Sequence, residues 1–173
     1  MFKNTGNKTP AKWEDQMPGL TSDIELHHYV TDLTVDEFTS LLKLYLKDEI
    51  LVTGTTSDPN GMTQSINGVA GQFEFKVIPQ DNWSNDVPCG AFNLQVTLGN
   101  KAGKADLLML NEYNKNVAGV KVFIDYPNIY TSSFLVVEYG VTGQTVVSQI
   151  AYLIESSRRL ILSLHKESEN TAN

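Results

Sequence analysis

The chain has 173 residues, of which 41% are hydrophobic and 19% are charged. This length and composition predict one globular domain whose core is large enough to fold without a disulfide or a metal. The formal net charge is −7 at pH 7, because 20 Asp and Glu residues outnumber 13 Lys and Arg residues. Such an excess of carboxylates disfavours phosphate backbones and anionic lipid, so we expect no nucleic-acid partner and no membrane.

The cellular compartment is indicated by the cysteine content and by the first residues of the chain. Cys89 is the single cysteine and cannot form an internal disulfide, so the sequence gives no sign of an oxidising compartment. Residues 1–10 are polar and lack the apolar stretch of a signal peptide, and apolar runs such as 134–137 are too short to cross a bilayer. We therefore expect a cytoplasmic protein.

The chain is predicted to hold a single domain between two polar ends. Residues 1–20 are rich in Asn, Lys, Thr, Gly and Pro and show no periodicity, which is typical of a mobile tail. The domain is expected to span 21–166, without an internal repeat or linker. Residues 167–173 are polar and are predicted to fray.

The first helix is predicted to begin after Thr34 and to end near Lys47. Thr34 and Glu37 have the spacing of a capping box, in which each side chain bonds to the other residue's backbone amide. Apolar residues then recur with helical period: they are Phe38, Leu41, Leu42, Tyr45 and Leu46.

Three strands are expected next, at 50–53, 72–78 and 91–98. The last of these alternates most clearly, with Phe92, Leu94, Val96 and Leu98 on one face and Asn93, Gln95 and Thr97 on the other. Period-two alternation is typical of an antiparallel sheet with one face in water. Residues 80–90 are predicted to be a connecting loop.

The second half of the chain is predicted to contain a helix at 104–115, strands at 120–126 and 133–139, and a long helix at 143–165. The complete order is α-β-β-β-α-β-β-α. Strands in clusters between helices favour the α+β class. We expect an antiparallel sheet of about five strands with the helices packed on one face.

Several segments of the second half resemble the YbjN family. They are the helix end Leu-Leu-Met-Leu-Asn-Glu-Tyr-Asn at 107–114, the strands 120–125 and 134–138, and Gly-Val-Thr-Gly at 140–143, which opens the last helix. Members of that family are described as sensory transduction regulators, and their fold is similar to that of type III secretion chaperones. The resemblance covers about 34–164 and implies a fold and action through protein contacts, but no reaction. It also implies a homodimer, since chaperones with this fold are typically acidic homodimers that hold an extended segment of a partner.

No residue pattern points to catalysis, a metal or a cofactor. Adjacent His27 and His28 would point to opposite faces of a strand and cannot share one metal, while a zinc site needs three or four converging ligands. Cys89 is better explained as a small buried residue than as a nucleophile. The sequence contains no complete calcium loop and no phosphate-binding glycine loop. We therefore assign no catalytic, metal-binding or cofactor-binding residue and expect no cofactor.

The remaining candidates are residues for binding a partner. Asn93, Gln95 and Thr97 are expected on the wet face of the sheet, and Asn111 and Asn114 at the end of the second helix, where an amide can also cap the helix.

These candidates favour a non-catalytic protein-binding module, either chaperone-like or a regulatory adaptor, that forms a homodimer and binds another protein. The alternatives are a small-molecule sensor and an immunity protein that caps a toxin. An enzyme that uses scattered residues such as Glu112, Tyr113, Asp125 and Glu138 is the least favoured reading.

Overall fold

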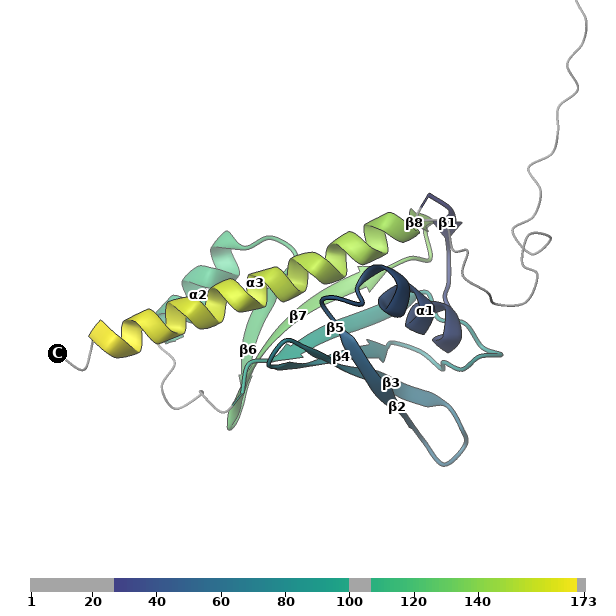
Figure 1. Cartoon of the computed structure of the whole chain (residues 1–173), viewed down its shortest axis with the longest axis horizontal. Helices are drawn as coiled ribbons and strands as arrows, with labels where there is room; N and C mark the ends of the chain where they lie inside the picture. Colours follow the sequence, from purple (N-terminus) through teal and green to yellow (C-terminus); the bar gives the residue numbers. More distant parts are fainter. Residues whose placement is uncertain (1–26, 100–106, 171–173) are drawn as a thin grey trace, which may run out of the picture.

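The computed structural model describes residues 27–99 and 107–170, and the side chains of these residues up to Leu164. Its elements in chain order are β1 (Tyr29–Val30), α1 (Val35–Tyr45), β2 (Leu51–Ser57), β3 (Thr63–Ala70), β4 (Phe73–Pro79), β5 (Ala91–Thr97), α2 (Leu107–Asn116), β6 (Lys121–Asp125), β7 (Asn128–Val136), β8 (Val141–Thr142) and α3 (Gly143–Asn170) (Figure 1). The tail expected at 1–20 and the predicted start of α2 at 104 lie outside the described residues.

The strands form one large and one small antiparallel sheet. The large sheet has six strands in the order β2-β3-β4-β5-β7-β6, and β1 pairs with β8 in the small one. Each neighbouring pair in the large sheet is antiparallel. The predicted α+β class is confirmed, but the expected count of about five strands and the order α-β-β-β-α-β-β-α are wrong, since four strands of the large sheet precede α2.

The strand of the large sheet that is missing from the prediction is β3. Its sequence, Thr-Gln-Ser-Ile-Asn-Gly-Val-Ala, is largely polar and includes Asn67-Gly68, a pair typical of turns. Pairing with both β2 and β4 makes it a strand. Gly68 suits this position because a Cβ there would lie 3.0 Å from the carbonyl oxygen of Leu51.

Helix α1 begins as predicted. The backbone amide of Thr34 donates to Glu37 Oε2 at 2.8 Å, and the amide of Glu37 donates to Thr34 Oγ1 at 3.3 Å, which completes the capping box. The amide of Asp36 donates to Asn85 Oδ1 at 3.1 Å, so the segment before β5 also contributes to this helix end. The helix ends at Tyr45, two residues before the predicted end near Lys47.

The segment predicted as a connecting loop, 80–90, is partly in the core. Trp83 is fully buried, and its indole Nε1 donates to the carbonyl oxygen of Leu33 at 2.7 Å. The indole also meets Phe38 of α1 and Phe92 of β5 edge to face, with ring centroids 5.8 and 5.0 Å apart. Trp83 therefore joins α1 to the sheet. The hydrophobic periodicity and the turn residues of the sequence did not predict that this side chain is buried.

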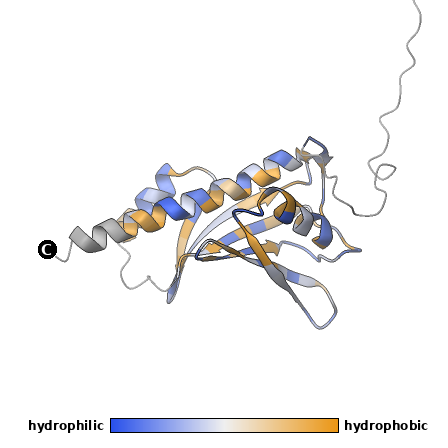
Figure 2. Ribbon diagram, viewed as in Figure 1, coloured by the Kyte–Doolittle hydropathy of each residue, from blue (hydrophilic) through white to orange (hydrophobic). Residues whose placement is uncertain are grey.

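Helix α3 lies along the sheet and packs against β5 and β7 (Figure 1). Its buried apolar residues are Val146, Ile150, Leu153, Ile154, Leu160 and Ile161. Hydrophobic and hydrophilic stretches alternate along its visible surface in Figure 2. The helix continues to Asn170, five residues beyond the predicted end at 165, and no Gly or Pro in this stretch interrupts it.

Candidate functional site: the open face of the sheet

The large sheet has one face under the helices and one that the helices leave uncovered, which we call the open face. On β5, Phe92, Leu94 and Val96 are fully buried toward the helices. The alternating residues Asn93, Gln95 and Thr97 are partly exposed, as the sequence predicts. These three candidate residues therefore lie together on the open face.

Strand β7 places a neighbour opposite each candidate residue of β5. Phe134 lies opposite Asn93, Ser132 opposite Gln95 and Tyr130 opposite Thr97. Directly opposed side chains on one face of an antiparallel pair lie within contact distance of each other. The polar row of β5 is therefore bordered by an aromatic residue at each end.

Two aromatic rings stack at the β6 side of this face. Phe123 of β6 lies opposite Tyr130, with ring centroids 5.3 Å apart and an angle of 15° between the ring planes. Phe123 is 39% exposed and Phe134 is 54% exposed. We call these three residues the aromatic border: Phe123 and Tyr130 stack at one end of the polar row, and Phe134 lies at the other end.

The sequence prediction did not include the aromatic border. The alternation within 120–125 places Phe123 on the face opposite to that of Val122 and Ile124. The exposure of Phe123 could therefore have been predicted from the sequence. Tyr130 had none, because β7 begins at Asn128 rather than at the predicted residue 133. Only the pairing of β6 with β7 brings the two rings together.

The polar candidates are available to a ligand. Within the described part of the chain, the side chains of Asn93, Gln95 and Thr97 make no hydrogen bond to another residue. The nearest charges beside this row are on β4, where Lys76 lies directly opposite Gln95 and Glu74 lies directly opposite Thr97. The centre of the open face therefore combines free amide and hydroxyl groups with aromatic carbon, and its β5 and β7 residues carry no charge.

Asn111 and Asn114 do not belong to this face. Asn114 Nδ2 donates to the carbonyl oxygen of Val122 at 2.9 Å, and the amide of Val122 donates to Asn114 Oδ1 at 2.7 Å. The side chain therefore binds the outer edge of β6 instead of capping its own helix. Asn111 is exposed on α2.

The residues considered for an enzyme are not brought together. Asp125 lies opposite Asn128, where β7 begins, whereas Glu138 follows the far end of that strand. Glu112 pairs with Lys115 at 2.5 Å on the surface of α2. No acid–base pair is formed by this group.

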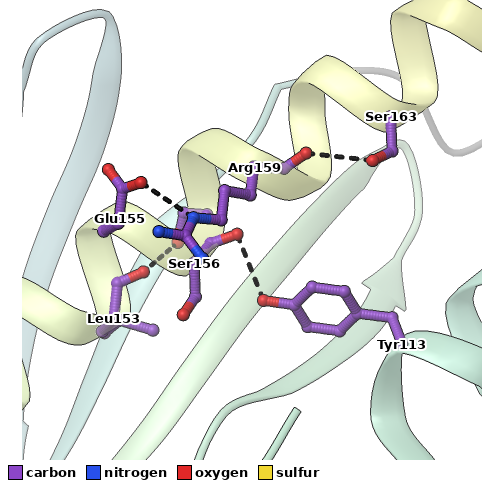
Figure 3. A network of polar contacts seen from close by, with 7 residues as sticks. Tyr113, Leu153, Glu155, Ser156, Arg159 and Ser163 are labelled. Atoms are coloured by element: carbon purple, nitrogen blue, oxygen red, sulfur yellow. Dashed lines mark hydrogen bonds and ion pairs between the residues drawn. The ribbon is translucent and has the colours of Figure 1, made fainter. Parts of the chain in front are cut away.

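Tyr113 instead joins two helices. Its hydroxyl donates to the carbonyl oxygen of Ser156 on α3 at 3.2 Å (Figure 3). Burial raises the pKa of the Tyr113 phenol above its usual value of 10.0. The neutral phenol can therefore donate this hydrogen bond throughout the physiological pH range.

Other kinds of site would be a metal centre, a reactive cysteine or a ligand cavity. Residues 27–99 and 107–164 contain no group of three or more His, Cys, Asp or Glu side chains that could hold a metal ion. Cys89 is buried, as predicted, and its Sγ lies 3.1 Å from the carbonyl oxygen of Ala91. A hollow of about 440 Å³ lies between α1 and β2, with Asp36, Thr39, Lys43, Thr53 and Thr55 in its lining.

Comparison with known proteins gives no further identification. No family model matches the chain, and no curated protein matches it either. Among the helices that the structure describes, none combines the length and the apolar character needed to cross a membrane.

Proposed function

We propose that the chain is a non-catalytic protein-binding module, chaperone-like or adaptor-like, which binds a polypeptide partner on the open face of its sheet. One observation carries this proposal: the free polar side chains of Asn93, Gln95 and Thr97 lie directly beside the aromatic border. Aromatic residues at the centre of a surface contribute much of the affinity in protein interfaces, and adjacent polar groups fix the orientation of the partner.

The chemistry of the face favours a particular kind of partner. Apolar side chains of a partner would cover Phe123 and Phe134, while its backbone or polar groups would bond to Asn93 and Gln95. The net charge of −7 attracts basic segments over long distances. The resemblance of about 34–164 to the YbjN family points the same way, since it implies action through protein contacts.

A photo-crosslinking experiment tests the proposal. A photoreactive residue replaces Gln95 on the open face, or, as a control, Tyr152, which is 48% exposed on α3. Crosslinking in the native cell should trap a protein through position 95 and not through position 152. The double variant Phe123→Ser/Phe134→Ser should prevent trapping, while its far-ultraviolet circular dichroism stays unchanged. Equal trapping at both positions, or none at either, would contradict the proposal.

The hollow between α1 and β2 supports a second candidate, a small-molecule sensor. Its volume of about 440 Å³ lies within the range of ligand pockets, and Thr39, Thr53 and Thr55 are among the residues that line it. A thermal-shift screen with metabolites and nucleotides separates the two candidates. A ligand that raises the melting temperature of the wild type, but not of Thr39→Leu, would favour the sensor.

A further inference from the structure

Two charged side chains border the polar row of the open face on its β4 side. Glu74 lies directly opposite Thr97, and Lys76 lies directly opposite Gln95. Phe75, between the two charged residues, is fully buried toward the helices, so Glu74 and Lys76 project onto the open face. In the described ranges, neither side chain forms an ion pair or a hydrogen bond with another residue. Both charges are therefore available to a ligand.

The register of the sheet places Glu74 in one row with an aromatic ring. This row runs from Glu74 through Thr97 to Tyr130. Phe123 stacks on one face of the Tyr130 ring, so the other face of that ring is on the β5 side, toward Glu74. A carboxylate and the face of an aromatic ring both attract a cation. The row therefore suits a Lys or Arg side chain, whose aliphatic stem can lie over Thr97.

The next two rows along the strands have different chemistry. In the middle row, Lys76 lies beside Gln95, and an ammonium group and an amide can both donate to a carboxylate. In the last row, Ile78 and Phe134 flank Asn93. Phe134 is exposed and Ile78 is half-buried, so this row can cover an apolar side chain.

The charges of β6 repeat this order at the other side of the face. Lys121 lies in the middle row, opposite Ser132, and its Nζ donates to the carbonyl oxygen of Asn114 at 2.9 Å. Asp125 lies opposite Asn128, beyond the row that contains the aromatic stack. Positive charge is therefore concentrated at the middle row, and negative charge at the end of the face where the rings stack.

An extended chain has the same repeat as these rows. Successive rows are two residues apart along β5, and alternate side chains of an extended segment project to one side with that period. Extended chains that pack on a sheet commonly align with its strands. A segment aligned in this way would place every second side chain against one of the three rows.

We propose that the open face binds an extended segment of another protein in which alternate residues are, in order, apolar, acidic and basic. The apolar side chain contacts Phe134, the acidic one binds Lys76, and the basic one lies between Glu74 and the Tyr130 ring. The acidic residue is central in whichever direction the segment runs. This inference rests on the proposed function and specifies the sequence of the partner.

Selection from a library of random peptides displayed on phage tests this order. The immobilised proteins are the wild type and Glu74→Lys/Lys76→Glu, which exchanges the two charges and keeps the net charge. The wild type should select peptides with an acidic residue midway between an apolar and a basic one. The double variant should select peptides with the basic residue in the middle. The same order on both proteins, or no charge order on the wild type, overturns the proposal.

The matched control exchanges a charge pair elsewhere on the surface. Glu155→Arg/Arg159→Glu reverses an exposed ion pair of α3 and should select the same peptides as the wild type. Thermal unfolding of both double variants shows whether they remain folded. A changed selection by this control would mean that the peptides bind outside the open face, which overturns the proposal.

Fluorescence anisotropy with two synthetic peptides gives an independent readout. The peptides are Thr-Leu-Thr-Glu-Thr-Lys-Thr and Thr-Leu-Thr-Lys-Thr-Glu-Thr, which differ only in the order of their charges. The wild type should bind the first about fivefold more tightly than the second, because two attractive charge pairs become repulsive. The preference should be reversed in Glu74→Lys/Lys76→Glu. Equal affinity of the wild type for both peptides overturns the proposal.

The failure of this inference is distinguishable from that of the proposed function. Mass spectrometry of the protein that is crosslinked in the cell through position 95 identifies the segment in contact. A crosslinked segment without the alternating apolar, acidic and basic residues would overturn the inference and leave the proposed function standing.

Discussion

The side-chain amide of Asn114 on α2 forms a pair of hydrogen bonds with the main chain of a single residue of β6, Val122. The donor–acceptor distances are 2.9 Å to the carbonyl oxygen and 2.7 Å from the backbone amide. This is the bonding pattern that a neighbouring strand would supply. Asn114 therefore closes part of one sheet edge and fixes α2 to the sheet.

Replacement of Asn114 should be costly, although the residue lies near a helix end. Asn114→Ala leaves both groups of Val122 without their partner and should lower the free energy of unfolding by about 1–3 kcal/mol. Asn111→Ala, at an exposed position of the same helix, is the matched control and should change stability by less than about 0.5 kcal/mol. Urea denaturation of both variants measures the difference. Equal midpoints would show that the Asn114 bonds contribute nothing.

The core contains a polar contact between β7 and α3. Thr131 Oγ1 lies 2.5 Å from Ser157 Oγ, and both residues are buried. Ser157→Ala leaves the threonine hydroxyl unpaired and should cost about 1–3 kcal/mol, whereas Thr131→Val/Ser157→Ala should cost less than the sum of the single changes. A double-mutant cycle from thermal or urea unfolding measures the coupling, and strict additivity would argue against it.

Leu153 of α3 is fully buried, so its replacement should have a large effect on the free energy of unfolding. Leu153→Asp places an unpaired carboxylate in the core and should lower stability by more than about 3 kcal/mol. Asp86→Ala changes an exposed side chain on the segment before β5 and should alter stability by less than about 0.5 kcal/mol. Denaturation midpoints that do not differ between the two variants would show the packing of α3 to be wrong.

The Tyr113 contact predicts a dependence on alkaline pH. Because burial raises the pKa of the folded-state phenol above 10.0, its stabilising effect is complete below pH 10 and is lost as the pH rises through the raised pKa. Tyr152 also raises this pKa and Arg159 lowers it, through their charges. Wild type should therefore lose its stability advantage over Tyr113→Phe as the pH rises above 10.

Unfolding measured at several pH values for both proteins checks this prediction, since their difference removes the contribution of the other tyrosines. A constant difference across the alkaline range would show that Tyr113 does not couple ionisation to folding.

The sequence by itself determined the local features of the fold. The capping box of Thr34 and Glu37 uses contacts within one helical turn, so it was predictable from spacing. The alternation of 91–97 depends only on the period of a strand and on burial of one face. The apolar stripe of α3 is equally local. The polar candidates Asn93, Gln95 and Thr97 followed from this reasoning.

Tertiary structure decided what depends on contacts between distant segments. β3 became a strand through its two neighbours, despite a polar sequence with a turn-like Asn67-Gly68. Trp83 entered the core because Leu33, Phe38 and Phe92 surround it. The stacking of Phe123 on Tyr130 depends on the register of β6 and β7. Each of these three features depends on strand pairing or side-chain packing between separate elements. The residue pattern within a single element does not predict such contacts.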